Sequence, residues 1–176
     1  GKQAIDAADV VFATTNGVPV DPGFFKDMRP DAEVVDASPL EVEEYYRMVI
    51  DAVRAGKKVV RLQPGDPSLF GSLAKQLNRF VAEGIQLDVI PGVTVGFAAA
   101  CALRLDLTLP GLSEAVVLTR QEARLPVPAH QRPAQLAEHR PTFILYLSAT
   151  LIAQLVRDLA NALPDTTPII VAHKVG

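Results

Sequence analysis

The stretch VVRLQPGDPSLFGSL, residues 59–73, holds the residues whose types and spacing could do chemistry. Its apolar start predicts a strand, which passes directly into QPGDP, a turn with two prolines, a glycine and one carboxylate. Gly65 lets the backbone approach a ligand closely, and Pro64 and Pro67 keep the turn stiff. The turn has no lysine or arginine and lacks the G-x-x-x-x-G-K-[ST] spacing, which argues against a loop that cradles phosphates.

Asp66 in this turn has two compatible interpretations. Followed by Pro67, it is a suitable N-cap for a helix with proline at its first position. Beside exposed backbone, the same carboxylate would repel phosphate and favour a ligand with cationic groups and hydroxyls. S-adenosyl-L-methionine carries a sulfonium, an ammonium and a ribose but no phosphate, so it suits this turn.

A second stretch, VIPGVTVGFAAACAL (89–103), repeats the order of strand, Pro-Gly turn and helix. Thr94 could cap that helix or form a hydrogen bond with an adenine or a ribose. Gly96 and the alanines after it leave a shallow helix face, which suits a close neighbour, either a ligand or a sheet. Ligands of open α/β sheets lie beyond the carboxyl ends of the strands, so two such turns predict one pocket.

The elements that must position these turns follow from the hydrophobic pattern. Strands alternate with helices along the 176 residues, which predicts an α/β fold with mainly parallel sheets and flanking helices. The helix that starts at Ser38 has this residue as its predicted N-cap and Glu41 at the capping-box position. We expect strands at 10–13, 33–37, 58–62, 86–90, 115–119, 142–148 and 167–175. We expect the main helices at 38–56, 72–84, 91–105, 134–139 and 149–163.

Composition excludes several classes of protein. With 21% charged residues and a formal net charge of −3, the chain lacks the clustered basic residues of a nucleic-acid surface. No apolar run is long enough for a transmembrane helix, and no signal peptide opens the sequence, so we expect no membrane partner. The single Cys101 excludes an internal disulfide and favours the cytoplasm. His130, His139 and His173 lack metal-ligand spacing, so we expect no metal.

Four stretches carry a family resemblance. RLQPGDPSLFGS, VIPGVTVGFAAACAL, LTLPGLSEAVVLTRQEARLPVP and TFILYLSATLI occur in an order and spacing that closely resemble the tetrapyrrole methylases, over nearly the whole chain. The LTLPG…LTR…PVP run is most similar to that of family members that methylate C11 of precorrin-4 or cobalt-precorrin-4. The resemblance implies a two-lobed fold with a ligand cleft between the lobes, and a homodimer. We place the lobes at 1–110 and 111–176.

The resemblance also implies an activity and a set of site residues. The activity is S-adenosyl-L-methionine-dependent methylation of a precorrin ring carbon in cobalamin biosynthesis, with S-adenosylhomocysteine as product. We expect no catalytic side chain, because aligning carbon, methyl and sulfur can itself supply roughly 7–11 kcal/mol. Arg120 and Arg124 are the candidates for binding substrate carboxylates, followed by Arg61 and Arg104. The implied cofactor contacts are Pro64, Gly65, Asp66, Leu69, Thr94, Val95, Leu147 and Val175.

The sequence departs from the family pattern at both ends. The family begins with a strand and a G-x-G-P-G turn, and it continues past a strand such as IIVAHKV. We therefore expect the N-terminal lobe to lack its first strand and the C-terminal lobe to be truncated. Two alternatives stay open: a methyltransferase for precorrin-2, precorrin-3 or uroporphyrinogen-III, and a truncated, non-catalytic module that binds tetrapyrrole or cofactor.

Overall fold

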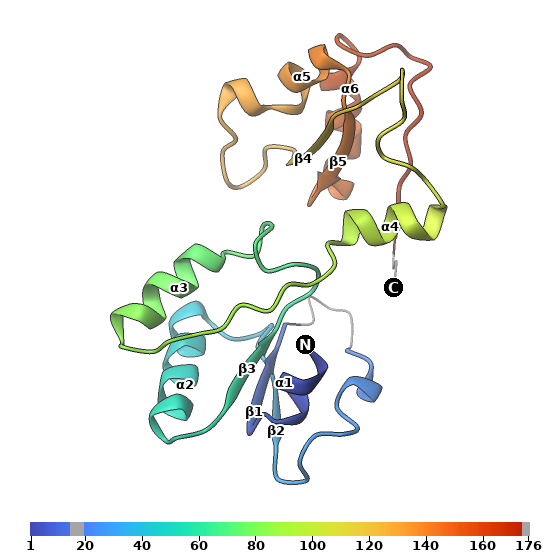
Figure 1. The fold of residues 1–176 in the computed structure, drawn as a ribbon. Coiled ribbons are helices and arrows are strands. Elements are labelled where there is room, and N and C mark those ends of the chain that lie inside the picture. Colours follow the sequence, from blue (N-terminus) through green and yellow to red (C-terminus); the bar gives the residue numbers. More distant parts are fainter. Residues whose placement is uncertain (15–19, 174–176) are drawn as a thin grey trace. The chain divides into compact units, whose positions relative to one another are not determined.

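The computed structural model describes residues 1–14 and 20–173 and forms two compact units that divide between Val95 and Gly96. Each unit contains a parallel sheet with helices packed on it, which confirms the predicted α/β fold (Figure 1). This division puts helix α4 (Val95–Leu103) almost entirely in the second unit, whereas the predicted lobes put it in the first. The lobe boundary near residue 110 stays a prediction.

The sheet of the first unit has three parallel strands in the order β2-β1-β3, so β1 is its central strand. All four residues of β1 are buried, as expected of a parallel strand that is covered on both faces. The strands are β1 (Val10–Ala13), β2 (Glu33–Asp36) and β3 (Val59–Leu62).

One face of this sheet is covered by α2 (Val42–Arg54) and α3 (Leu73–Ala82). The ring of Phe12 from β1 meets that of Tyr45 from α2 edge to face, with centroids 5.6 Å apart. Phe80 of α3 joins the same buried cluster. The buried residues of α2 recur at helical spacing and form this core, whereas Val42 at the start of the helix is 63% exposed.

The opposite face of the sheet is covered by the short helix α1 (Lys2–Asp6). Its Ile5 packs against Val11, whose side chain points away from that of Phe12 because strand residues alternate between faces. The chain then makes the 3₁₀ turn η1 (Pro22–Phe24), where Asp21 accepts a hydrogen bond from the Gly23 N–H at 2.8 Å.

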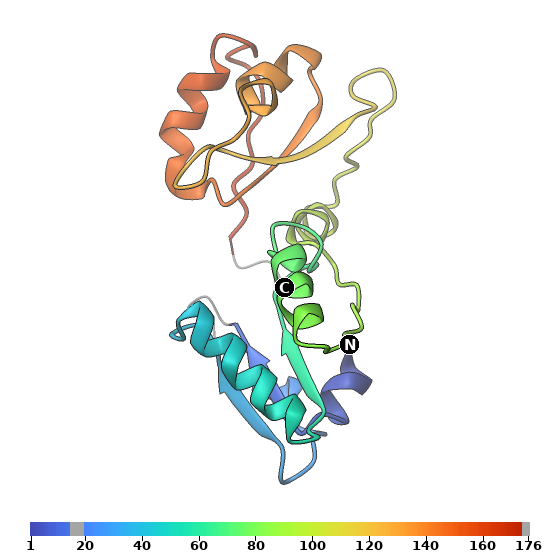
Figure 2. The same cartoon turned by 90° about the vertical axis from the view of Figure 1, so that its left-hand side faces the viewer.

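The second unit pairs two parallel strands, and helix α6 packs on one face of them (Figure 2). Leu155 packs on one face against Phe143. On the other face, a Cβ added to Gly96 would lie 2.5 Å from Ile144 Cγ2, so this glycine lets α4 pack closely on β5. The elements are β4 (Val116–Arg120), β5 (Thr142–Tyr146), α5 (Pro133–Leu136) and α6 (Ile152–Leu159), with 3₁₀ turns η2 (Ala129–Gln131), η3 (Ala137–His139) and η4 (Ala149–Leu151).

Two predicted strands and one predicted cap are wrong. Residues 86–90 and 167–173 belong to no strand, while residues 174 and 175 lie outside the described part of the chain. Helix α2 begins at Val42 and not at the predicted Ser38 cap. The Ser38 N–H instead donates to Asp36 Oδ1 at 2.9 Å, so this segment forms a turn.

A search of the described residues found no helix with the length and apolar character that a membrane span requires.

Candidate functional site

The first turn, residues 63–72, follows β3 directly and leads into α3. Gly65 has a φ of +76°, which an L-residue with a side chain adopts only at a cost. A Cβ added to Gly71 would lie 2.1 Å from Gln63 Nε2 and 2.4 Å from the Pro67 carbonyl oxygen, so no side chain fits there. The glycines are therefore required by the shape of this turn.

The second turn, residues 91–94, lies directly against the first. The Gly92 N–H donates a hydrogen bond to Asp66 Oδ2 at 2.9 Å. A Cβ added to Gly92 would lie 2.0 Å from the Gly65 carbonyl oxygen, and one added to Gly65 would lie 3.9 Å from Thr94 Cα. The structure thus brings together the two turns that the sequence analysis assigned to one pocket.

The Asp66 carboxylate is the polar group that joins these turns. Its Oδ1 accepts the Ser68 N–H at 2.9 Å and also the Ser68 hydroxyl, while Oδ2 accepts the Gly92 N–H. The Ser68 hydroxyl, the Gly92 N–H and the Ser68 N–H, in that order of importance, lower the pKa of the Asp66 carboxyl. Asp66 is therefore ionised at neutral pH, where it stabilises the junction of the turns.

The helix-cap interpretation of Asp66 is wrong. Helix α3 begins at Leu73, and Ser72 occupies its N-cap position. Asp66 lies in the turn before it and bonds to Ser68 and Gly92 instead of the helix N-terminus.

The junction leaves groups that a ligand could reach. Pro64 and Gly65 are exposed, and Val95 at the start of α4 is 48% exposed. Leu69, in the first turn region, and Thr94, directly before Val95, are half-buried. Such a site offers backbone N–H and C=O groups and small apolar surfaces, next to one fixed negative charge.

The second unit places Arg120 at the end of β4, as predicted. Its guanidinium donates to the carbonyl oxygens of Leu125 at 2.9 Å and Pro126 at 3.0 Å. Arg120 therefore holds the loop that follows its own strand. Arg124 lies exposed in the same loop.

Leu147 directly follows β5 and has two features of a special position. It is 74% exposed, and its φ of +53° is uncommon for a residue with a branched side chain. Next to it in sequence is Ser148, whose Oγ accepts the Gln121 N–H at 2.8 Å; both residues are only 4% exposed. The sequence analysis missed this buried pair, although each member follows shortly after a strand end, where functional residues gather. Val175 lies outside the described residues.

The two further arginine candidates take different places. The Arg61 guanidinium lies 5.1 Å from the centre of the Tyr45 ring, on the α2 side of the sheet. Its Nε is buried and has no hydrogen-bond partner among the described residues. Arg104 lies just after α4, with a left-handed φ of +56°. Arg61 therefore packs within the first unit.

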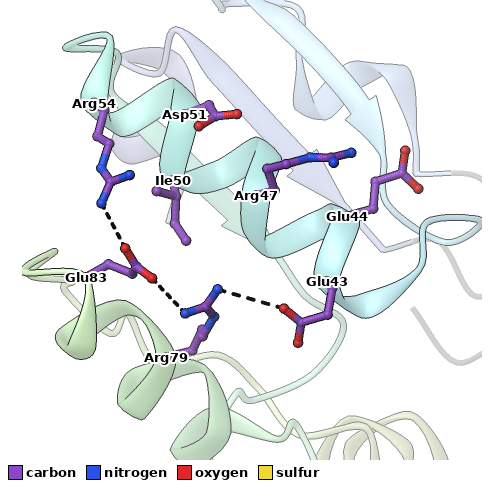
Figure 3. A pocket seen from close by; sticks show the side chains of 8 residues that line it. All are labelled: Glu43, Glu44, Arg47, Ile50, Asp51, Arg54, Arg79 and Glu83. Atoms are coloured by element: carbon purple, nitrogen blue, oxygen red, sulfur yellow. Dashed lines mark hydrogen bonds and ion pairs between the residues drawn. The ribbon is translucent and has the colours of Figure 1, made fainter.

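A groove between α2 and α3 is lined mainly by charged residues, four of which form a chain of ion pairs (Figure 3). Glu83 bonds to Arg54 at 2.8 Å and to Arg79 at 2.7 Å, and Arg79 also lies 3.8 Å from Glu43. These partly exposed ion pairs link the two helices, and none of the predicted site residues lines this groove.

The structure thus has two α/β units with parallel strands, and two glycine-containing turns that a carboxylate joins. Comparison with known proteins assigns this combination to one family. The chain belongs to the tetrapyrrole (corrin/porphyrin) methylases, whose family model matches residues 1–176. It is 37% identical to the cobalt-precorrin-4 C(11)-methyltransferase of Priestia megaterium over 175 residues, which are 99% of this chain and 67% of that protein.

Two further relatives support the same family assignment. The precorrin-4 C(11)-methyltransferase of Mycobacterium tuberculosis is 40% identical over 146 residues, which are 81% of this chain and 58% of that protein. A solved cobalt precorrin-4 methyltransferase is 36% identical with a TM-score of 0.84, covering 92% of this chain and 66% of that chain. The chain thus spans about two thirds or less of the length of these relatives.

Proposed function

We propose that the protein transfers a methyl group from S-adenosyl-L-methionine to C11 of precorrin-4 or cobalt-precorrin-4, in cobalamin biosynthesis. Relatives with this activity in their names are 37% and 40% identical to most of the chain. The observation that carries the proposal is the junction of the two turns. It unites six of the eight residues that the family resemblance assigns to the cofactor.

The chemistry of the junction fits this cofactor. Gly65 and Gly92 are both exposed, so their backbone groups are open to a ligand, and the missing Cβ of Gly92 lets the Gly65 carbonyl lie against it. Asp66 is the ionised residue within these two turns, and its charge suits a cationic ligand and disfavours a phosphate. Pro64, Gly65, Leu69, Thr94 and Val95 would hold the cofactor at this junction, whose shape Asp66 fixes, while Leu147 and Val175 stay contacts that the family resemblance predicts.

The chain's own residues contribute binding and orientation. When bound, S-adenosyl-L-methionine supplies a methyl group that its sulfonium has already activated. The backbone of the two turns would hold and orient the cofactor, and Leu69 and Val95 would offer it apolar surface. Alignment of this kind is the main source of rate enhancement, so no side chain needs to act as nucleophile or base.

Substrate binding falls to arginines of the second unit. A precorrin carries many carboxylates, and a guanidinium binds a carboxylate through two parallel hydrogen bonds. Arg120 is held at the end of β4 by two carbonyl oxygens, and Arg124 is exposed in the loop after it. We assign both to the carboxylates of the substrate.

We further propose a cytoplasmic homodimer. Cys101 is an exposed, free thiol, which suits a reducing compartment. Helix α4 is apolar all round, yet Ala100 is its one buried residue among those described. Phe97 and Leu103 on this helix are each 45% exposed, and such an apolar surface suits contact with a second copy. Sedimentation at several protein concentrations tests this assembly.

Methyl transfer itself is the direct test. The purified protein is incubated with precorrin-4 and S-adenosyl-L-methionine carrying a ¹³C methyl group, and NMR locates the label. We expect the label on C11. Uroporphyrinogen-III, precorrin-2 and precorrin-3 are offered in parallel, and a label on one of these instead would assign the chain to another position of the ring. Absence of label from every tetrapyrrole, with the cofactor still bound, would indicate a non-catalytic binding module.

A further inference from the structure

We propose that Asp66 is a positioning residue: it serves the cofactor through the second turn, whose backbone it fixes at Gly92, and not by contact with the cofactor's charges. This inference rests on the proposed function. It assigns to Asp66 a role that differs from both a helix cap and a direct ligand contact.

The hydrogen bonds of Asp66 support this role. One carboxylate oxygen accepts the N–H and hydroxyl of Ser68 within the first turn, and the other accepts the Gly92 N–H across the junction at 2.9 Å. Each oxygen therefore already holds a protein donor. A carboxylate that bridges two segments in this way orients both of them.

The second turn depends on this bond. Gly92 has its Cα against the Gly65 carbonyl oxygen, where an added Cβ would lie only 2.0 Å away. Gly92 therefore has no side chain that could hold the turn in place, and its N–H is the group through which Asp66 does so. Thr94 and Val95 lie two and three residues after Gly92, so their position relative to Gly65 depends on the same contact.

Another aspartate in the same unit provides a matched control. Asp36 ends β2 and accepts the Ser38 N–H at 2.9 Å, which is the same Asp-x-Ser turn that Asp66 forms with Ser68. Hydrogen bonds with Ser38 account for the lowered pKa of Asp36, without a donor from a distant segment. Asp36→Asn therefore changes the local turn alone, whereas Asp66→Asn also loses an acceptor that bridges two turns.

The test compares two ligands by calorimetry. S-adenosylhomocysteine has the ammonium and carboxylate of the cofactor, whereas 5′-methylthioadenosine has the adenosine and sulfur without either charge. If Asp66 acts through the second turn, Asp66→Asn weakens both ligands by the same factor, about tenfold for a lost charge-assisted hydrogen bond. Asp36→Asn leaves both affinities unchanged. Loss for S-adenosylhomocysteine alone would mean direct contact with the charged end, and no loss for either would also overturn the proposal.

A second readout does not need a ligand. In the wild-type protein, the amide signal of Gly92 in NMR shifts as Asp66 titrates, below about pH 4. Asp66→Asn abolishes this titration, and a Gly92 signal that Asp66→Asn leaves unchanged would contradict the positioning role. If the wild-type protein binds neither ligand, the proposed function is wrong, and so is the proposal that Asp66 serves cofactor binding. The Gly92 titration would then still decide whether Asp66 fixes the turn.

Discussion

Replacing Gly92 by alanine tests whether the fit between the two turns controls cofactor binding. The added Cβ would lie 2.0 Å from the Gly65 carbonyl oxygen and 3.1 Å from the Gly65 carbonyl carbon. Both partners belong to the backbone, so the clash cannot be relieved by rotating a side chain. One of the two turns must move.

The size of this movement follows from the contact distances. Real Cβ atoms keep at least 3.0 Å from other heavy atoms, so the 2.0 Å contact must open by about 1 Å. Overpacking of this kind costs about 1–3 kcal/mol of unfolding free energy. In a chain of this length that lowers Tm by about 2–12 °C. A misplacement of about 1 Å at a site that works by alignment can reduce the rate about 100-fold.

The assay pairs thermal unfolding with methyl transfer, and Gly84→Ala is the control. Gly84 ends α3 with a φ of +73° and has nothing within 4 Å of an added Cβ. Alanine there costs about 1–2 kcal/mol through backbone strain alone. We expect both variants to lower Tm, and Gly92→Ala alone to lose kcat/KM under conditions where both are folded. Equal activity of the two variants would refute the idea that contact between the turns sets the geometry of the site.

Three further outcomes test the core, the second unit and the response to acid. Phe12→Ala lowers the free energy of unfolding by about 3–5 kcal/mol, because this ring is 1% exposed. Phe24→Ala, on a 50% exposed ring, costs far less; equal denaturation midpoints would contradict the assigned core. Ser148→Ala leaves the buried Gln121 N–H without its acceptor and costs about 1–3 kcal/mol in denaturant unfolding. The folded state lowers the pKa of the Asp66 carboxyl. The ionised carboxylate therefore stabilises the folded state fully above the pKa of the unfolded chain, about 3.9, and this stabilisation is lost as the pH falls through the lower pKa of the folded state. Tm should therefore stay level down to about pH 5 and fall below about pH 4, less steeply in Asp66→Asn; an equal fall in both proteins would count against this contribution.

Local patterns in the sequence predicted most of the first unit. The apolar run at Val10–Ala13 forms the expected strand, and α2 and α3 end within two residues of the expected ends, just before Gly56 and Gly84. Burial and the positive φ of these glycines are properties of single positions, which a local pattern can indicate. The run at 86–90 has the same local character but forms no strand. A strand needs a second segment to share its N–H and C=O groups, and residues 86–90 alone do not show whether one is available.

The site was predictable to a similar extent. Glycines and prolines after β3 and before α4 indicated two turns in one place, and the structure joins them. The partner of Asp66 was not predictable, because a cap, a ligand contact and a bridge all require the same short carboxylate. Which backbone N–H groups Asp66 binds depends on how close Gly92 lies to it in the folded chain, and the sequence does not give that distance. Ser38 differs, because its N–H bonds to Asp36 only two residues before it, and this local turn replaces the predicted helix cap.

The central position of β1 also has a consequence for synthesis. Of these three strands, β1 leaves the ribosome first, yet both of its hydrogen-bonding edges pair with later segments, Glu33–Asp36 and then Val59–Leu62. Until then its apolar side chains have no sheet to join. Nascent chains that end before Leu62 should therefore bind chaperones, and release should coincide with the arrival of the third strand.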